Sequence, residues 1–234
     1  NDISSEGFNI YTNLVKNFDD YTRGNLIIEN VNKKTNTVVK DDNLPSSSYT
    51  SAIEDRNVER TMISATYEFD NPESDNFIDY FKLTAYTQYA YSEDDSILDV
   101  ASSTSRRGVT TPAHKLKNDY DLKDDSYGAN LQLRSDFINP NVNHRLTYGL
   151  DYSLTSNSRK RAKIQTGGVT ATTTVKDSPD SDTTLLGIYL QDEISFNNSK
   201  WEIIPGIRFD YYDLDSTVDS IYLQSSKSEN PVDI

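Results

Sequence analysis

The stretch at 182–213, DTTLLGIYLQDEISFNNSKWEIIPGIRFDYYD, contains two long runs in which apolar and polar residues alternate. The apolar positions are Leu186, Ile188, Leu190, Ile194 and Phe196 in the first run, then Trp201, Ile203, Pro205, Ile207, Phe209 and Tyr211 in the second. A period of two predicts β-strands, and the polar segment between the runs predicts a turn. An apolar face with aromatic ends and a polar opposite face is typical of a membrane-spanning strand.

The same alternation recurs along the chain, and the connections between the runs follow a regular order. We predict further strands at 60–69, 81–91, 127–137 and 146–154, and two more within 7–31. Short turns at 70–76, 138–143 and 197–200 alternate with long polar segments at 32–57, 92–126 and 155–181. Outer-membrane barrels have short periplasmic turns and long extracellular loops, so this spacing predicts an all-β, antiparallel transmembrane β-barrel.

The predicted strands carry charge almost entirely on one side. On the predicted lipid-facing side of the clearest strands only Asp192 is ionised, close to the periplasmic end, where a charge costs little. The opposite side holds Glu68, Lys82, Arg134, Asp136, Arg145, Asp151, Glu193, Glu202, Arg208 and Asp210. We expect this side to face a wet or plugged lumen, with its arginines paired to carboxylates of neighbouring strands or of a plug.

Composition excludes several other classes of protein. The net charge of -14 argues against nucleic acid as a partner, because phosphate binding needs a basic surface. The lack of cysteine excludes a disulfide framework and a zinc–thiolate site, and no apolar run approaches the ~20 residues of a spanning helix. The first residues, NDISSEGFNI, lack the segments of a signal peptide, so we expect that one was removed or that the chain begins inside a longer protein.

Two stretches resemble a known family. The segment GIYLQDEI at 187–194 and the following WEIIPGIRFD at 201–210 resemble a recurrent barrel hairpin of TonB-dependent outer-membrane receptors. HRLTYGLDYS at 144–153, with Arg159 and Arg161 after it, resembles the branch that takes haem or haemoglobin. The resemblance covers 60–213. It implies a receptor in the bacterial outer membrane, surrounded by lipid, that captures haem or haemoglobin and moves the ligand inward with energy from the TonB complex.

The sequence also departs from the family pattern. The N-terminal plug, the TonB-contacting segment before it and the terminal aromatic strand are not recognisable, and neither is the Arg-Ala-Pro segment of the haem branch. The haem branch also carries an Asn-Pro-Asn-Leu segment after the Pro-Gly hairpin. The NPNV at 139–142 looks similar but precedes that hairpin, so we interpret it as a turn. About six to eight strands are far fewer than the ~22 of a plugged transporter. We therefore expect residues 1–234 to be an internal part of the barrel domain.

Candidate site residues are few. With two histidines, no cysteine, no phosphate-binding loop and no HExxH pattern, the chain is not expected to be an enzyme or to carry a covalently bound cofactor. His114 lies in a predicted extracellular loop and is our candidate haem-iron ligand, with a solvated loop histidine as the alternative. His144 begins a strand near the periplasmic side, and we assign it a structural role.

Each charged run in the predicted loops could either bind a ligand or simply be exposed to solvent. Arg159–Arg161, RKR, would suit haem propionates or lipopolysaccharide phosphates, or is simply solvated. The acidic clusters at 93–95 and 119–125 lack the ligand spacing of an EF-hand, so we interpret them as solvated loop.

Three other functions remain open at this stage. The chain could belong to a siderophore receptor of the same superfamily, or to a non-transporting adhesin or porin barrel. It could also be a soluble β-sandwich, which would fold in water without detergent. A plug encoded upstream would indicate transport.

Overall fold

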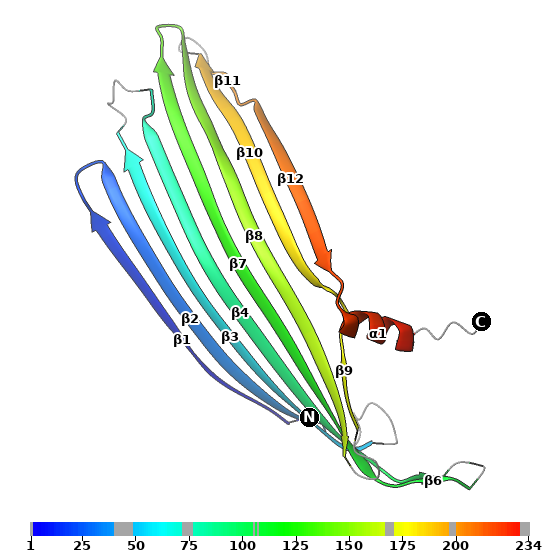
Figure 1. The fold of residues 1–234 in the computed structure, drawn as a ribbon. Helices are drawn as coiled ribbons and strands as arrows, with labels where there is room; N and C mark the ends of the chain where they lie inside the picture. The colour runs from blue at the N-terminus through cyan, green and yellow to red at the C-terminus, as the bar shows by residue number, and fades with distance from the viewer. Residues whose placement is uncertain are drawn as a thin grey trace.

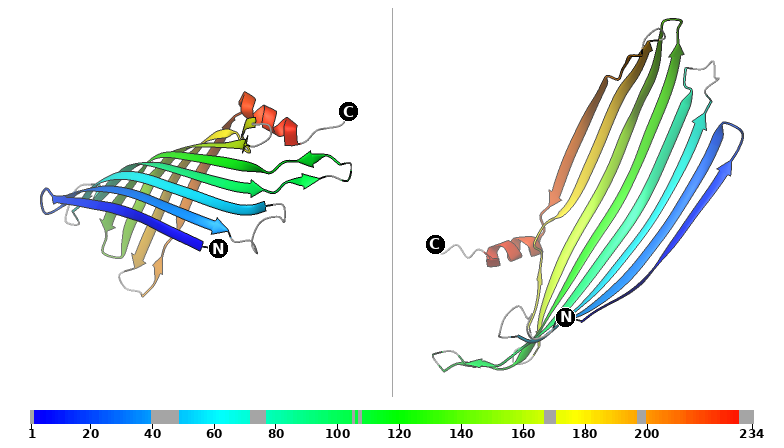
Figure 2. Two further views of the ribbon diagram at one scale, coloured as in Figure 1. Left: turned by 90° about the horizontal axis from the view of Figure 1, so that it is seen from below. Right: turned by 180° about the vertical axis from the view of Figure 1, so that it is seen from behind.

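A computed structural model describes residues 2–39, 49–71, 77–104, 106, 108–166, 171–196 and 200–229. Most of them form one curved, twisted antiparallel sheet that is open on two sides (Figures 1 and 2). Its long strands are β1 (Asp2–Asn17), β2 (Thr22–Val39), β3 (Tyr49–Asp70), β4 (Tyr80–Val100), β7 (His114–Ile138), β8 (Val142–Thr166), β10 (Asp180–Phe196) and β12 (Gly206–Thr217). Each pairs with the next in this order, which is the arrangement of a barrel wall and confirms the predicted partial barrel.

The remaining elements are short. β9 (Ala171–Val175) pairs with β8, and β11 (Glu202–Ile203) pairs with β10. β5 (Ser103–Thr104) and β6 (Thr110–Thr111) form a separate small hairpin, and α1 (Ser220–Glu229) follows β12. This helix was not predicted. No helix among the described residues combines the length and apolar character needed to cross a membrane.

The connections sort to opposite ends of the sheet, as predicted. One end, here called the turn end, carries the tight turns between β1 and β2 and between β7 and β8 (Figure 1). The other, here called the loop end, carries the β5–β6 hairpin and the segment with β9. The predicted turns at 70–76 and 197–200 lie largely outside the described residues, although the strands that flank them meet at the turn end.

The long predicted loops were wrong in extent, because most of their residues continue the strands. β4 runs to Val100, β7 begins at His114 and β8 runs to Thr166, so the strands extend far into the predicted loop segments. The polar residues of these extensions pair across strands instead of facing water alone. The pairs include Arg56 with Asp94 at 2.6 Å, Lys117 with Asp95 at 3.2 Å and Lys115 with Asp99 at 3.4 Å.

The register gathers the apolar residues on one side of the sheet. Leu131 pairs with Leu83 on one side and Leu150 on the other. The same row continues through Tyr67, Ile188 and Phe209. We call this side the outer face and the opposite side the inner face. Ala52 is the only hydrophobic residue in the described chain that is buried, so none of the described segments covers the outer apolar band.

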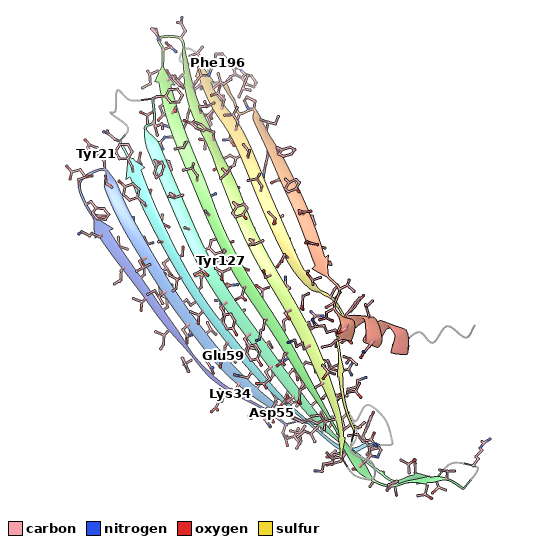
Figure 3. The ribbon with its side chains drawn as sticks, viewed as in Figure 1. Tyr21, Lys34, Asp55, Glu59, Tyr127 and Phe196 are labelled. Carbon is pink, nitrogen blue, oxygen red and sulfur yellow. The ribbon has the colours of Figure 1, made fainter. Side chains whose placement is uncertain are left out.

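The apolar band crosses the sheet diagonally. Phe8, at one side of the sheet, begins a row that continues as Asn32, Glu59, Tyr91, Lys123 and Ser158. The row is apolar on β1 but charged or polar by β7 and β8. Strands of a membrane barrel are tilted by about 35–45°, so a horizontal lipid layer must cut their hydrogen-bonded rows at an angle. Tyr21 in the β1–β2 turn and Phe196 lie at the turn end, whereas Lys34 and Asp55 lie towards the loop end (Figure 3).

The predicted strand at 201–211 exists, but Pro205 interrupts it. β11 and β12 pair with β10 in one continuous register, with Ile203 opposite Ile194 and Gly206 opposite Gln191. Proline lacks the N–H that a ladder needs, although its carbonyl still accepts a 3.0 Å hydrogen bond from the Asp192 N–H. The interruption is therefore local and leaves the faces of the strand unchanged.

Candidate functional site

The middle of the inner face carries a closed charge cluster. Arg208 lies 3.0 Å from Asp151 on β8 and 2.7 Å from Asp210 on its own strand. Its guanidinium lies 5.8 Å from the ring centroid of Tyr189. A Cβ at Gly187 would collide with the Arg208 guanidinium and lie 2.9 Å from the Asp210 carboxylate. Glycine therefore makes room for this crossing, and the predicted pairing of Arg208 across strands is confirmed.

A second group of paired charges lies at the turn end. Arg134 contacts Asp70 at 2.9 Å and Asp136 at 3.3 Å, and Arg145 contacts Asp136 at 2.9 Å. The nearly buried carboxylate of Asp79 accepts a 2.5 Å hydrogen bond from the Asp136 backbone N–H. These contacts join β3, β7 and β8, with the segment before β4, where the turns are short, so they support the wall and occupy the two arginines in ion pairs.

Asp192, the one ionised residue predicted on the lipid-facing side, lies on the outer face near the turn end. Asp192 accepts a hydrogen bond from His144 Nδ1 at 2.8 Å. Both side chains lie on the outer face, because Leu146 pairs with Asp192 and is two residues from His144 on the same strand. This confirms a structural role for His144, which supplies the partner of an otherwise isolated carboxylate.

Acidic residues gather on the outer face towards the loop end. Lys117 lies 3.2 Å from Asp95 and 2.8 Å from Asp119. Burial, followed by the hydrogen bond with Asp119, raises the pKa of Asp95 above its usual range. No group of three or more histidine or acidic residues in the described ranges is placed to hold a metal ion. The predicted solvated acidic loops are therefore strand residues held by lysine.

His114 lies at the loop end as the first residue of β7. Its ring is half-buried, and Nδ1 lies 3.1 Å from the carbonyl oxygen of Pro112. Successive strand residues alternate between faces, so His114 shares the inner face with Leu116 and Tyr120. The sequence predicted an exposed loop position, whereas the structure places it at the rim of the inner wall.

Three cations form a line on the inner face of β8 at the same end. Arg159, Arg161 and Lys163 alternate with Lys160 and Ala162, which face outward. We call these three residues the basic stripe. The Arg161 guanidinium lies 4.8 Å from the ring centroid of Tyr120 on β7. Sequence reasoning singled out Arg159–Arg161 but missed Lys163 and the opposite orientation of Lys160, both of which follow from a strand period of two.

A hollow of about 430 Å³ adjoins the basic stripe. Its lining combines cations with apolar and polar side chains: Tyr49, Leu98, Leu116, Asn118, Arg161 and Lys163. Arg134, Arg145 and Arg208 deeper in the wall have close carboxylate partners, whereas Arg159 and Lys163 at this end have none among the described residues. The inner face at this end is therefore suited to guiding an anionic molecule.

Comparison with known proteins agrees with this architecture. The family described as TonB dependent receptor-like, beta-barrel matches residues 1–230. Its members are transporters and receptors of the bacterial outer membrane, not enzymes. A comparison with curated proteins finds no match. Since the match extends over nearly the whole sequence and the strands form the expected wall, the chain belongs to the TonB-dependent receptor β-barrel family.

Proposed function

We propose that this chain is part of the wall of a bacterial outer-membrane receptor that imports haem or haemoglobin-derived iron with energy from TonB. The outer apolar band would contact lipid, and the loop end would face the cell exterior. The plug and the remaining strands of the barrel would come from residues outside this stretch. The local resemblance of residues 144–153 to haem receptors supports the choice of ligand.

The observation that carries the haem proposal is the position of His114 on the same inner face as the basic stripe. Imidazole is a common axial ligand of haem iron. Arginine and lysine are suited to the haem propionates, since charge-assisted hydrogen bonds to carboxylates are among the stronger polar contacts. Leu116 lies on β7 between His114 and the residues opposite the stripe, and offers apolar surface to the porphyrin. One wall thus carries groups for iron, ring and carboxylates.

A siderophore receptor is the second candidate. Many iron chelates are anionic, and the basic stripe would attract them without any need for an iron ligand such as His114. In that case the histidine would only make its contact with the Pro112 carbonyl. The two candidates therefore differ in whether His114 affects binding.

Haem titration of the intact receptor in detergent tests the proposal. Absorbance is followed for the wild type, for His114→Ala and for Thr166→Ala, a polar control on the outer face of β8 at the same end. We expect a haem band in the wild type and the control, and a band that is shifted and at least about tenfold weaker in affinity for His114→Ala.

Each alternative result has a distinct meaning. A normal haem band in His114→Ala would remove this residue as the iron ligand. No haem band in the wild type would refute haem as the ligand and favour a siderophore, leaving the membership of the receptor family untouched.

A further inference from the structure

The basic stripe stands out because the protein as a whole is strongly acidic, with a net charge of -14. Its three members face inward from consecutive inner positions of one strand. Arg159 and Lys163 are exposed, and neither has an ion-pair partner among the described residues. A run of cations in which two have no ion pair raises the local concentration of anions.

The nearest carboxylates do not neutralise the stripe. Asp94, which pairs with Tyr120 across the sheet, is already bound by Arg56 through two of its guanidinium nitrogens, at 2.6 and 3.1 Å. Asp124, on the inner face of β7, accepts a 3.0 Å hydrogen bond from Ser126. Asp177 lies 3.9 Å from Arg161, at the limit of an ion pair.

Arg161 itself is held ready for a further contact. Its guanidinium packs on Tyr120, which fixes the direction of the side chain. Its Nε is buried and has no hydrogen-bond partner within the described part of the chain. The hollow beside it offers Leu98 and Leu116 on one side and Lys163 on the other. Cations next to apolar surface fit a ligand that is both anionic and partly apolar.

We propose that the basic stripe is the site where the incoming ligand's anionic groups, carboxylates or similar oxyanions, first bind on their way into the barrel. This inference rests on the proposed transport function and adds to it the charge of the ligand. It names the transported molecule and not membrane lipid, because the stripe lies on the inner face. Only Lys160 of the charged run faces the lipid side.

The test uses pyranine, a water-soluble pyrene sulfonate, as a flat polyanionic probe of the intact receptor in detergent. Fluorescence anisotropy gives its affinity for the wild type, for Arg159→Gln/Lys163→Gln and for Lys160→Gln. The first variant changes exposed side chains and leaves the Arg161–Tyr120 contact in place. The second removes a charge from the same strand on the opposite face.

We expect the double variant to bind at least about tenfold more weakly and to lose most of its salt dependence, because each lost cation removes a charge-assisted contact. Lys160→Gln should bind as the wild type does. Equal affinity in all three proteins, equal weakening by Lys160→Gln, or no binding to the wild type would overturn the proposal. Displacement of pyranine by added lipopolysaccharide would overturn the assignment to a transported ligand.

The pyranine titration and the haem titration test separate proposals, so a negative result in one leaves the other valid. A receptor that binds pyranine through the stripe but shows no haem band would keep the anion site and exclude haem. A receptor with a haem band that depends on His114 but not on the stripe would keep haem and exclude the anion site.

Discussion

Lys176 joins the end of β9, the start of β10 and the start of α1, and replacing it should release them. It follows β9, is 2% exposed, and its ammonium lies 2.7 Å from Asp180 at the start of β10 and 2.5 Å from Asp219. Asp219 also caps α1, because its side chain accepts a 2.8 Å hydrogen bond from the Tyr222 N–H. In Lys176→Met the two carboxylates would lose their shared cation, and α1 would lose its attachment to the sheet.

The size of the effect follows from how far each group is removed from water. Breaking a fully buried ion pair by removing one partner costs about 3–5 kcal/mol. Here the side chains of Asp180 and Asp219 are 36% and 34% exposed, so water recovers part of their solvation when the lysine is lost. We therefore expect a loss of about 2 kcal/mol in the free energy that keeps α1 docked. Such a loss raises the open population about thirtyfold.

Hydrogen exchange of the intact receptor in detergent measures this opening. The amides of α1 and β9 should exchange about thirtyfold faster in Lys176→Met, whereas β7 and β8 in the membrane band should not change. Lys160→Met, which removes an exposed cation from β8, serves as the matched control. Unchanged exchange of α1 in Lys176→Met would refute the role given to this contact.

The same contact should depend on pH at both extremes. Hydrogen bonds to Asp180 and Asp219 raise the pKa of Lys176, and this lysine in turn lowers the pKa of Asp219. Burial alone would raise the pKa of Asp180, but the Lys176 hydrogen bond lowers it overall. A raised lysine pKa stabilises below about 10, and lowered aspartate pKa values stabilise above about 4. Protection of α1 should therefore be constant between about pH 5 and 9 and fall outside that window.

Two further substitutions test the wall itself. Gly149→Ala should destabilise the receptor by about 3 kcal/mol in detergent unfolding, because a Cβ there would collide with the β7 backbone and with Tyr189. Gly206→Ala, whose nearest neighbour would be 3.6 Å away, should change the unfolding midpoint little, and equal effects would contradict this account. His144→Leu should cost about 1–2 kcal/mol by leaving Asp192 unpaired on the lipid side. Adding Asp192→Asn should restore most of that loss, and a double variant as unstable as His144→Leu would argue against the pairing.

The sequence predicted the strands best where one side of the wall meets lipid. The runs around Leu83, Leu131 and Leu150 alternate without interruption, and the structure places these residues side by side. Charged side chains are costly on the side that meets lipid, so apolar residues occupy every second position of these strands. The pairing of Arg208 with Asp151 was also predictable, because inner positions of adjacent strands are neighbours.

The strand extensions beyond the membrane could not be found in the same way. There both sides of the sheet are polar, so the alternation that reveals a strand is lost. Asp94 and Asp95 look like solvated loop in the sequence, yet each meets a cation on the adjacent strand, Arg56 or Lys117. Register alone brings these partners together, and register depends on the whole hairpin. The basic stripe could be predicted only in part for the same reason. Its three members share one face because β8 continues past Thr155.

The two faces of this wall are stabilised in different ways, and the difference locates the ligand path. Outer side chains such as Ile188 and Phe209 are exposed and would be buried only by lipid, which has no water to compete for the backbone ladder. Inner arginines such as Arg208 at mid-wall and Arg134 at the turn end are already paired with carboxylates, so an anion binding to them would have to break existing contacts. At the loop end Arg159 and Lys163 have no such partners. For the proposed anionic ligand, the loop end would therefore offer the first free cations, and its movement past the paired arginines would require a separate source of energy.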